Sequence, residues 1–320
     1  MDRMLVISGS PHIHAPFSAR GAMWRVIFAL LPALGCALYY FGIGAAIVSV
    51  TAMVGCVAVE YLIARFMMGR KSATFSVSAL LTGLLLALNL PSNIPVWIVL
   101  IGCVVAIGIG KMAFGGLGCN IFNPALVGRV FLLLSFPQQM TSWPLPEVNR
   151  MAYLDASTGA TVLSELKTGV ISPSGVDLVD EAIGLTGGSM GEVGALALII
   201  GVLYLMVSRV ITWHIPVAVV GAVALMTVVA GGNVGVELMG GGLLLGAFFM
   251  ATDYVTSPMT PRGMLVYGAM IGVITMVIRH YGAYPEGVSF AILVMNGVTP
   301  LLNKWFRPRR FGERRVAHVR

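Results

Sequence analysis

The sequence predicts an all-α integral membrane protein with about ten transmembrane helices, each requiring about 20 apolar residues. Of its 320 residues, 58% are hydrophobic and only 10% are charged, whereas a soluble domain carries about 25% charged residues. The mean hydropathy is +0.91. Because the shortage of charge extends along most of the chain, we expect the whole molecule to lie in lipid. A protein held by one membrane anchor would be apolar in one segment only.

The hydrophobic residues fall into segments separated by short polar stretches. Several segments are shorter than a full span and are interrupted by glycine or proline, which is typical of half-helices buried within a bundle. We therefore expect a mixture of full helices and half-helices, formed by residues 23–41, 43–66, 74–90, 96–111, 121–136, 194–208, 213–230, 240–254, 263–280 and 287–304.

The distribution of basic residues predicts the orientation. With the N-terminus inside and alternating segments, most of the 20 basic residues fall on the inner side. Outside lie only Arg150, Lys167 and Arg279, while Arg129 lies within a segment. Because basic residues mark the cytoplasmic side, we expect both termini in the cytoplasm. A basic tail is also compatible with nucleic-acid binding, but behind a membrane helix a topology anchor is favoured, and no nucleic-acid partner is expected.

This orientation divides the chain into five parts. A cytoplasmic N-terminal segment is followed by a five-helix repeat, a long outer loop with more acids than bases, a second five-helix repeat and a basic cytoplasmic tail. Loops of this length are usually functional or disordered. The expected boundaries are 1–22, 23–136, 137–193, 194–304 and 305–320.

The two halves resemble each other in sequence. Residues 81–87 and 242–247 are both rich in leucine and small residues, and asparagine precedes proline at 120–124 and at 296–300. An odd number of segments per half forces the two halves into opposite orientations. We therefore expect inverted repeats, which place binding sites near the midplane at interrupted helices.

The outer loop contains a motif that predicts a modification site. Residues 155–161 read DASTGAT and fit the pattern D-x-x-[ST]-G-A-T, at which a flavin transferase attaches FMN to the last threonine. The Thr161 hydroxyl can attack the phosphate of FAD and become a phosphoester of FMN, as the pyrophosphate bond breaks and AMP leaves. Gly159 and Ala160 leave room for a bulky donor, while Asp155 and Thr158 supply polar contacts. A turn rich in small residues is the alternative.

Polar side chains near the segment breaks form a second candidate site. Unpaired polar groups are costly in lipid, so these side chains face a cavity or each other. They either line a second flavin or ion site at the repeat interface or cap half-helices, and one residue can do both. They are Asn89, Asn120, Asn123, Asp253, Asn296 and Asn303.

Other polar residues predict no further site. Glu60 lies inside a segment five residues before Arg65, a spacing that fits one helix face poorly, so an interfacial anchor is favoured. The four cysteines show no CxxC spacing, and neither a metal site nor a disulfide framework is expected.

Taken together, these motifs resemble a known family, that of the RnfD component of the Rnf ion-translocating electron-transport complex. This family also includes NqrB of the sodium-pumping NADH:quinone reductase. The resemblance covers essentially the whole chain. It is carried by residues 115–125, 155–161, 251–258 and 284–291.

The resemblance implies more than the residues alone do. It implies covalent FMN on Thr161, a fold similar to urea and ammonium channels, and riboflavin as a second, non-covalent flavin within the helices. It implies a multi-pass protein of the bacterial inner membrane with the FMN loop in the periplasm. The implied partners are the other subunits of the complex, including a second one with covalent FMN, and the flavin transferase. Such a protein is part of a translocase that links ferredoxin and NAD oxidoreduction to a Na⁺ or H⁺ gradient, and is not catalytic alone.

Two other functions remain open on the residues alone. A urea- or ammonium-type channel or carrier would use the inverted repeat without a redox cofactor. A structural scaffold would leave the motif unused. The motif in 155–161 favours the redox protein, because a channel needs no modified threonine.

Overall fold

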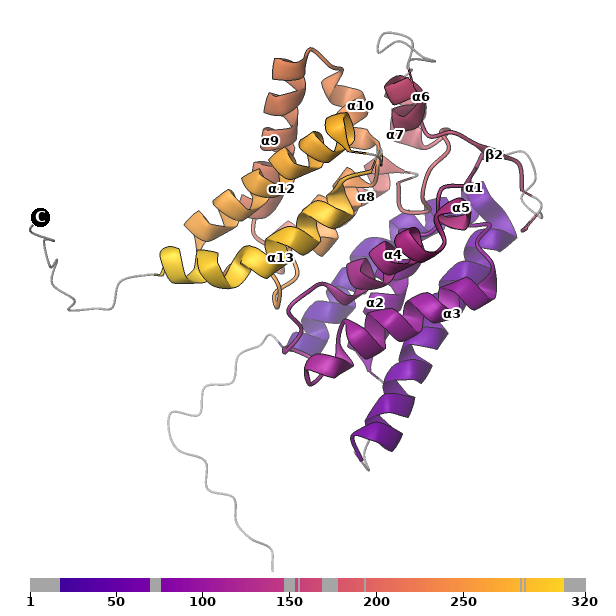
Figure 1. Ribbon diagram of the computed structural model, residues 1–320, viewed down its shortest axis with the longest axis vertical. Coiled ribbons are helices and arrows are strands. Elements are labelled where there is room, and N and C mark those ends of the chain that lie inside the picture. The colour runs from indigo at the N-terminus through magenta and orange to yellow at the C-terminus, as the bar shows by residue number, and fades with distance from the viewer. Residues whose placement is uncertain are drawn as a thin grey trace, which may run out of the picture.

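The computed structural model describes residues 18–69, 76–146, 153–154, 156–168, 178–192, 194–282, 284 and 286–307. The N-terminal and C-terminal halves lie side by side, and the segment between them covers one end of the bundle (Figure 1). The predicted N-terminal segment up to residue 17, most of the basic tail and Asp155 lie outside the described residues.

Helices make up nearly all regular structure in the described ranges. The N-terminal half contains α1 (Ala19–Leu62), α2 (Val77–Leu88), α3 (Val96–Val104) and α4 (Pro124–Ser135). The C-terminal half contains α8 (Ala195–Val207), α9 (His214–Ala230), α10 (Val234–Met239), α11 (Leu243–Leu245), α12 (Pro261–Tyr281) and α13 (Val288–Trp305). Between the halves lie α5 (Pro137–Met140), β1 (Trp143–Pro144), β2 (Thr158–Gly159), α6 (Val162–Thr168) and α7 (Leu178–Ile183).

Helix α1 is two helices joined at Gly42. This glycine has φ of 58° and ψ of −129°, a backbone conformation that L side chains rarely adopt and that breaks the helix. The N-terminal part begins at Ser18, whose side chain accepts a hydrogen bond from the backbone nitrogen of Gly21. The break falls between segments 23–41 and 43–66, where the sequence predicts two separate helices.

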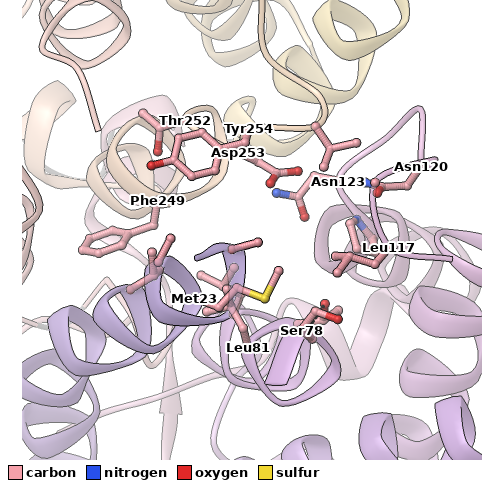
Figure 2. Close-up of a pocket in the computed structure, with 18 of the residues that line it drawn as sticks. Met23, Ser78, Leu81, Leu117, Asn120, Asn123, Phe249, Thr252, Asp253 and Tyr254 are labelled. Atoms are coloured by element: carbon pink, nitrogen blue, oxygen red, sulfur yellow. Dashed lines mark hydrogen bonds between the residues drawn. The ribbon is translucent and has the colours of Figure 1, made fainter. Parts of the chain in front are cut away.

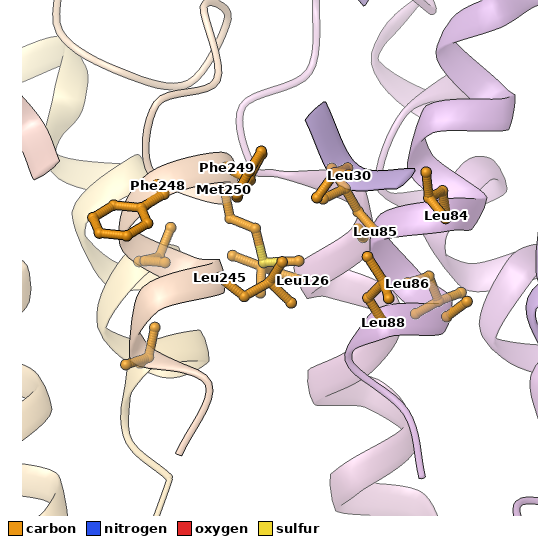
Figure 3. Packing of buried hydrophobic residues seen from close by; sticks show 14 of the residues in the cluster. Leu30, Leu84, Leu85, Leu86, Leu88, Leu126, Leu245, Phe248, Phe249 and Met250 are labelled. Atoms are coloured by element: carbon orange, nitrogen blue, oxygen red, sulfur yellow. The ribbon is translucent and has the colours of Figure 1, made fainter. Parts of the chain in front are cut away.

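Two short helices meet in the centre of the molecule. Helix α2 ends at Asn89, and α11 continues into a π-helical turn, Gly246–Met250. The Asn89 amide nitrogen lies 3.5 Å from Met250 Sδ, so the ends of the two elements touch. Figure 3 shows leucines of α2 facing Leu245, Phe248 and Met250 across Leu126. This contact between the halves forms the middle of the buried core.

Small residues allow the helices to approach closely. A Cβ atom on Gly83 would lie 2.5 Å from the Ala52 carbonyl oxygen, and one on Gly272 would lie 2.7 Å from Ala222 Cβ. Helix pairs in membranes use such residues, because close backbone approach supplies the van der Waals contact that drives their association.

The outer surface of the bundle is apolar. Three helices are long and apolar enough to cross a membrane by length and composition: Ala19–Met67, Val96–Phe114 and Pro261–Tyr281. Four shorter apolar helices are Val77–Leu88, Pro124–Ser135, Ala195–Val207 and His214–Ala230. Large apolar side chains such as Phe28 and Val50 in α1 and Leu225 in α9 are exposed. Such a surface suits lipid and not water, and the chain is an all-α membrane protein.

The strand pair fixes the start of the candidate modification site. Strands β1 and β2 are antiparallel, with Trp143 opposite Gly159 and Pro144 opposite Thr158. A Cβ atom on Gly159 would lie 2.9 Å from Leu145 Cδ2. Only glycine fits this position without moving Leu145, so the packing of the chain on itself accounts for the glycine of the motif.

Candidate functional site

Thr161 immediately precedes α6 and is separated from β2 by Ala160. The residue is 4% exposed, and its Oγ1 accepts a hydrogen bond of 3.3 Å from the backbone nitrogen of Ser164. Of the other motif residues, Thr158 and Ala160 are exposed and Gly159 is half-buried, whereas Asp155 lies outside the described residues. The structure thus separates the buried threonine from the exposed residues that precede it.

A cavity of about 390 Å³ opens beside Thr161. Its volume lies within the range of about 300–1,000 Å³ that is typical of ligand pockets. Its walls come from α4, the strand pair, the start of α6 and the segment before α13. They comprise Arg129, Leu133, Met140, Thr141, Trp143, Ala160, Thr161, Ser164, Tyr284 and Glu286.

Arg129 supplies the positive charge of this cavity. Its Nη1 donates to Asn89 Oδ1 at 3.0 Å and to Ser289 Oγ at 2.6 Å, and its Nη2 pairs with Glu286. Within the described residues, Arg129 Nε and Glu286 Oε1 have no hydrogen-bond partner although both are buried. The wall therefore has an unused donor and an unused acceptor, which a polar ligand can satisfy.

On its other side Thr161 borders a cluster of carboxylates in the loop region. Burial raises the pKa of Glu181 to about 8, and the nearby charge of Glu192 adds to this effect. Burial also raises the pKa of Glu192 to about 7, with Glu286 contributing. The sequence shows these residues only as part of an acidic loop, because what distinguishes them is burial by segments distant in the sequence.

A second cavity, of about 270 Å³, lies between the two halves near the start of α1. Its walls are mainly apolar and include Phe249, Leu81 and Met23 (Figure 2). Asn120, Asn123 and Asp253 all line it, as Figure 2 shows. The structure thus brings together three of the polar residues that the sequence assigns to a second site.

Another of these polar residues, Asn296, does not line this cavity but contacts Asn123, which does. Its amide group is 2.7 Å from the Tyr267 hydroxyl oxygen and 3.1 Å from the backbone nitrogen of Asn123. Asn123 in turn caps α4 by accepting a hydrogen bond from the Ala125 nitrogen, and it donates to the Met250 carbonyl at 3.2 Å. Asn123 therefore caps a helix and also lines the cavity.

One buried ion pair joins two segments within each half of the chain. Lys111, beyond α3, pairs with Glu60 near the end of α1 and also contacts Ser78. Arg279, in the last turn of α12, pairs with Glu237 of α10 at 2.6 Å. Both cations are nearly fully buried. The sequence favours an interfacial anchor for Glu60, whereas in the structure Glu60 is largely buried and pairs with Lys111, 51 positions away.

Among the described residues, no group of three or more His, Cys, Asp or Glu side chains converges in a way that could hold a metal ion. The four cysteines are free.

Comparison with known proteins identifies the family of this chain. The model of the NQR2, RnfD, RnfE family matches residues 6–312. The chain belongs to this family. It is 44% identical to the component designated D in the Na(+)-translocating ferredoxin:NAD(+) oxidoreductase complex of Acetobacterium woodii, with 98% of this chain and 96% of the relative covered.

Other members of the NQR2, RnfD, RnfE family are named for different ions. The corresponding component of the proton-translocating ferredoxin:NAD(+) oxidoreductase complex of Clostridium ljungdahlii is 41% identical, over 98% of this chain and 97% of the relative. That of the ion-translocating oxidoreductase complex of Actinobacillus succinogenes is 36% identical, over 97% and 98%. The relative named for sodium and the relative named for protons are thus about equally similar to this chain.

Proposed function

We propose that this chain is the membrane-embedded RnfD component of an ion-translocating electron-transport complex, and that Thr161 carries FMN through a phosphoester. The family match over residues 6–312 and the relatives support the first part. The single observation that carries the second part is the position of Thr161. The last residue of the motif lies in the wall of a cavity large enough for a ligand.

The residues of the cavity fit a flavin. Trp143 and Tyr284 offer aromatic surfaces, and the unpartnered Arg129 Nε and Glu286 Oε1 offer a donor and an acceptor for a polar ring edge. When bound, FMN supplies reversible electron transfer. The chain itself positions the group through Thr161, excludes water with apolar walls and places the Arg129 charge nearby.

The attachment reaction places a condition on the loop. In the folded structure Thr161 is 4% exposed, so a flavin transferase cannot reach its hydroxyl while α6 is docked. Transfer therefore takes place while this segment is undocked from the bundle, before or during assembly with the other subunits.

Covalent attachment is tested on a denaturing gel. The complex is produced together with a flavin transferase, and the band of this chain is inspected for fluorescence under ultraviolet light. We expect fluorescence in wild type and in Thr141→Ala, which alters the same cavity, and none in Thr161→Ala. Mass spectrometry of the peptide around residue 161 should show an FMN-sized addition. A colourless wild-type band would instead favour a channel or carrier without a redox cofactor.

We infer that the second cavity holds the non-covalent flavin, riboflavin, or an ion. The cavity is mainly apolar and has a few convergent polar groups, Asn120, Asn123 and Asp253, with Asn296 behind them, as small-molecule sites do. Extraction of flavin from wild type and Asn123→Ala, followed by chromatography, tests the first occupant. Asp253→Asn tests the second, because unchanged gradient formation would exclude a coupling role for this carboxylate.

We also propose ten spans in two inverted repeats, with both termini cytoplasmic and the loop 137–193 periplasmic, in a bacterial inner membrane. The matched ion pairs of Lys111 and Arg279 and the matched short helices support this arrangement. The predicted boundaries 1–22, 23–136, 137–193, 194–304 and 305–320 follow from it.

The orientation is tested by cysteine labelling in whole cells with a membrane-impermeant reagent. The four native cysteines are first replaced by serine, and Thr168→Cys and Arg307→Cys are then introduced one at a time. Thr168→Cys should react and Arg307→Cys should not. The reverse pattern would place the loop in the cytoplasm.

A further inference from the structure

Two arginines and four carboxylates lie near Thr161 on the loop side of the bundle. Arg129 pairs with Glu286, and Arg279 pairs with Glu237. Each arginine is thus neutralised by one carboxylate. In the described part of the chain, Glu181 and Glu192 make no ion pair, so each lacks a cationic partner when it is ionised. Because uncompensated buried charge is unfavourable, these two carboxylates favour a bound cation.

Glu192 is bound in a manner that suits an ionised carboxylate. Its Oε1 accepts a hydrogen bond from the backbone nitrogen of Gly241, and its Oε2 accepts from the Ser189 nitrogen at 3.0 Å and from Ser189 Oγ at 3.3 Å. Hydrogen bonds donated to a carboxylate stabilise its charged form. These hydrogen bonds offset part of the effect of burial, which still raises the pKa of Glu192, and they hold its two oxygens in place.

Glu181 differs from Glu192 in having a free oxygen. It is 5% exposed, and its Oε2 has no hydrogen-bond partner within the described residues. Glu181 and Glu192 line the same small cavity, together with Thr161, Thr186, Gly187 and Gly240. The cavity holds about 10 Å³, close to the least space that one water-sized particle needs.

We propose that Glu181 and Glu192 form a binding site for one monovalent cation, a proton or a sodium ion, held at Glu181 Oε2 beside Thr161. The cation supplies the positive charge that the cluster lacks and the partner that this oxygen lacks. The charged groups that face the site are Glu192 and Glu237 on the negative side and Arg279 on the positive side, with Glu286 and Arg129 beyond Glu192. This site does not depend on the presence of FMN.

The position of the site gives it a role if FMN is present. Thr161 lines both the 390 Å³ cavity and the small cavity of Glu181. Negative charge added to a group on Thr161 attracts a cation at Glu181 Oε2, and by linkage a bound cation favours that added charge to the same extent. The site therefore couples charge on the Thr161 side to binding of one cation at Glu181 Oε2.

The test is an infrared titration of the purified complex that contains the full chain, in buffer with choline as the sole added cation. Wild type should show bands of protonated carboxyl groups that disappear as pH rises. Glu181→Gln should lack the component that disappears at the highest pH, and the matched control Glu165→Gln, on α6, should retain it. Identical titrations of wild type and Glu181→Gln would overturn the proposal.

A second arm identifies the cation. Sodium chloride is added at fixed pH and compared with choline chloride. Loss of the wild-type band on addition of sodium alone assigns the site to sodium, with protons as competitors, and no response assigns it to protons. If Glu181→Gln does not assemble, Glu181→Asp replaces it and should titrate with a displaced midpoint; an unchanged midpoint would overturn the proposal. In Thr161→Ala, which carries no attachment point, the carboxyl band and its pH dependence should remain as in wild type. A failure of flavin attachment is thereby distinguished from a failure of this cation site.

Discussion

The hydroxyl oxygen of Thr161 accepts a hydrogen bond from the backbone nitrogen of Ser164 at 3.3 Å. The atom that we propose as the attachment point for FMN is therefore also the cap of α6. Both flavin attachment and the start of α6 depend on this oxygen. A test of attachment therefore needs one substitution that keeps the hydroxyl and one that removes it.

Thr161→Ser keeps the hydroxyl, so it keeps flavin attachment and the cap of α6 in part. Thr161→Ala removes both the attachment point and the cap. Loss of a capping side chain costs about 1 kcal/mol. We expect Thr161→Ser to retain flavin fluorescence on a denaturing gel and near-wild-type thermal stability of the purified complex. Thr161→Ala should lose the fluorescence and unfold at a slightly lower temperature. Equal fluorescence of the alanine and serine variants would show that the flavin is attached elsewhere.

The pair of Arg129 and Glu286 should be far more sensitive to single than to double substitution. Arg129→Met leaves Glu286 without its cation, and breaking a buried pair costs about 3–5 kcal/mol. We expect low recovery and a much lower unfolding temperature for Arg129→Met, and substantial rescue in the double variant Arg129→Met/Glu286→Met. Size-exclusion chromatography measures the recovery of the complex, and thermal unfolding measures its stability. A double variant no more stable than the single one would indicate that Arg129 acts mainly through Asn89 and Ser289.

The sequence predicts the features that depend on neighbouring residues. Segment limits at Gly42 and at Asn89-Leu90-Pro91 follow from local backbone preferences, and the motif ending at Thr161 can be recognised without a structure. The asparagines near the breaks are also predicted to share a site, and Asn120 and Asn123 do line one cavity.

The charged pairs could not be predicted in this way. Arg129 and Glu286 are 157 positions apart, and Glu60 and Lys111 are 51 apart. Local spacing offers Arg65 as a partner for Glu60, but a helix face cannot bring residues five apart together well. The role of Glu181 is hidden for the same reason, because its burial arises from contacts between α7, α8 and α10.

Stability of the loop region should fall as pH rises. The folded-state pKa of Glu181 is about 8, against 4.5 for the ordinary group, because burial disfavours its charged form. The folded state therefore binds more protons than the unfolded state between pH 4.5 and about 8, and stability decreases with pH across that window. For Glu192 the window ends at about 7.

Thermal unfolding of the complex at several pH values measures this dependence. Wild type should lose stability from the acidic end of the window to its alkaline end, and Glu181→Gln should lose less, since glutamine is neutral throughout. The control Glu165→Gln should behave as wild type. A steeper loss in Glu181→Gln would mean that another group titrates in this range.

The contact between α8 and α1 gives a test of the packing between the halves. A Cβ atom on Gly201 would lie 2.3 Å from the Ala29 carbonyl oxygen, so Gly201→Ala forces the two helices apart. Overpacking of this kind costs about 1–3 kcal/mol. Gly221, in α9, has no atom within 4 Å of the added Cβ position apart from the backbone of its own helix and its chain neighbours, and alanine there gains up to about 1 kcal/mol of helix propensity. We expect Gly201→Ala to lower the unfolding temperature of the complex and Gly221→Ala to leave it unchanged or raise it. Equal effects of the two substitutions would mean that α8 and α1 are not in the close contact described. The arrangement of the two halves around the second cavity would then have to be revised.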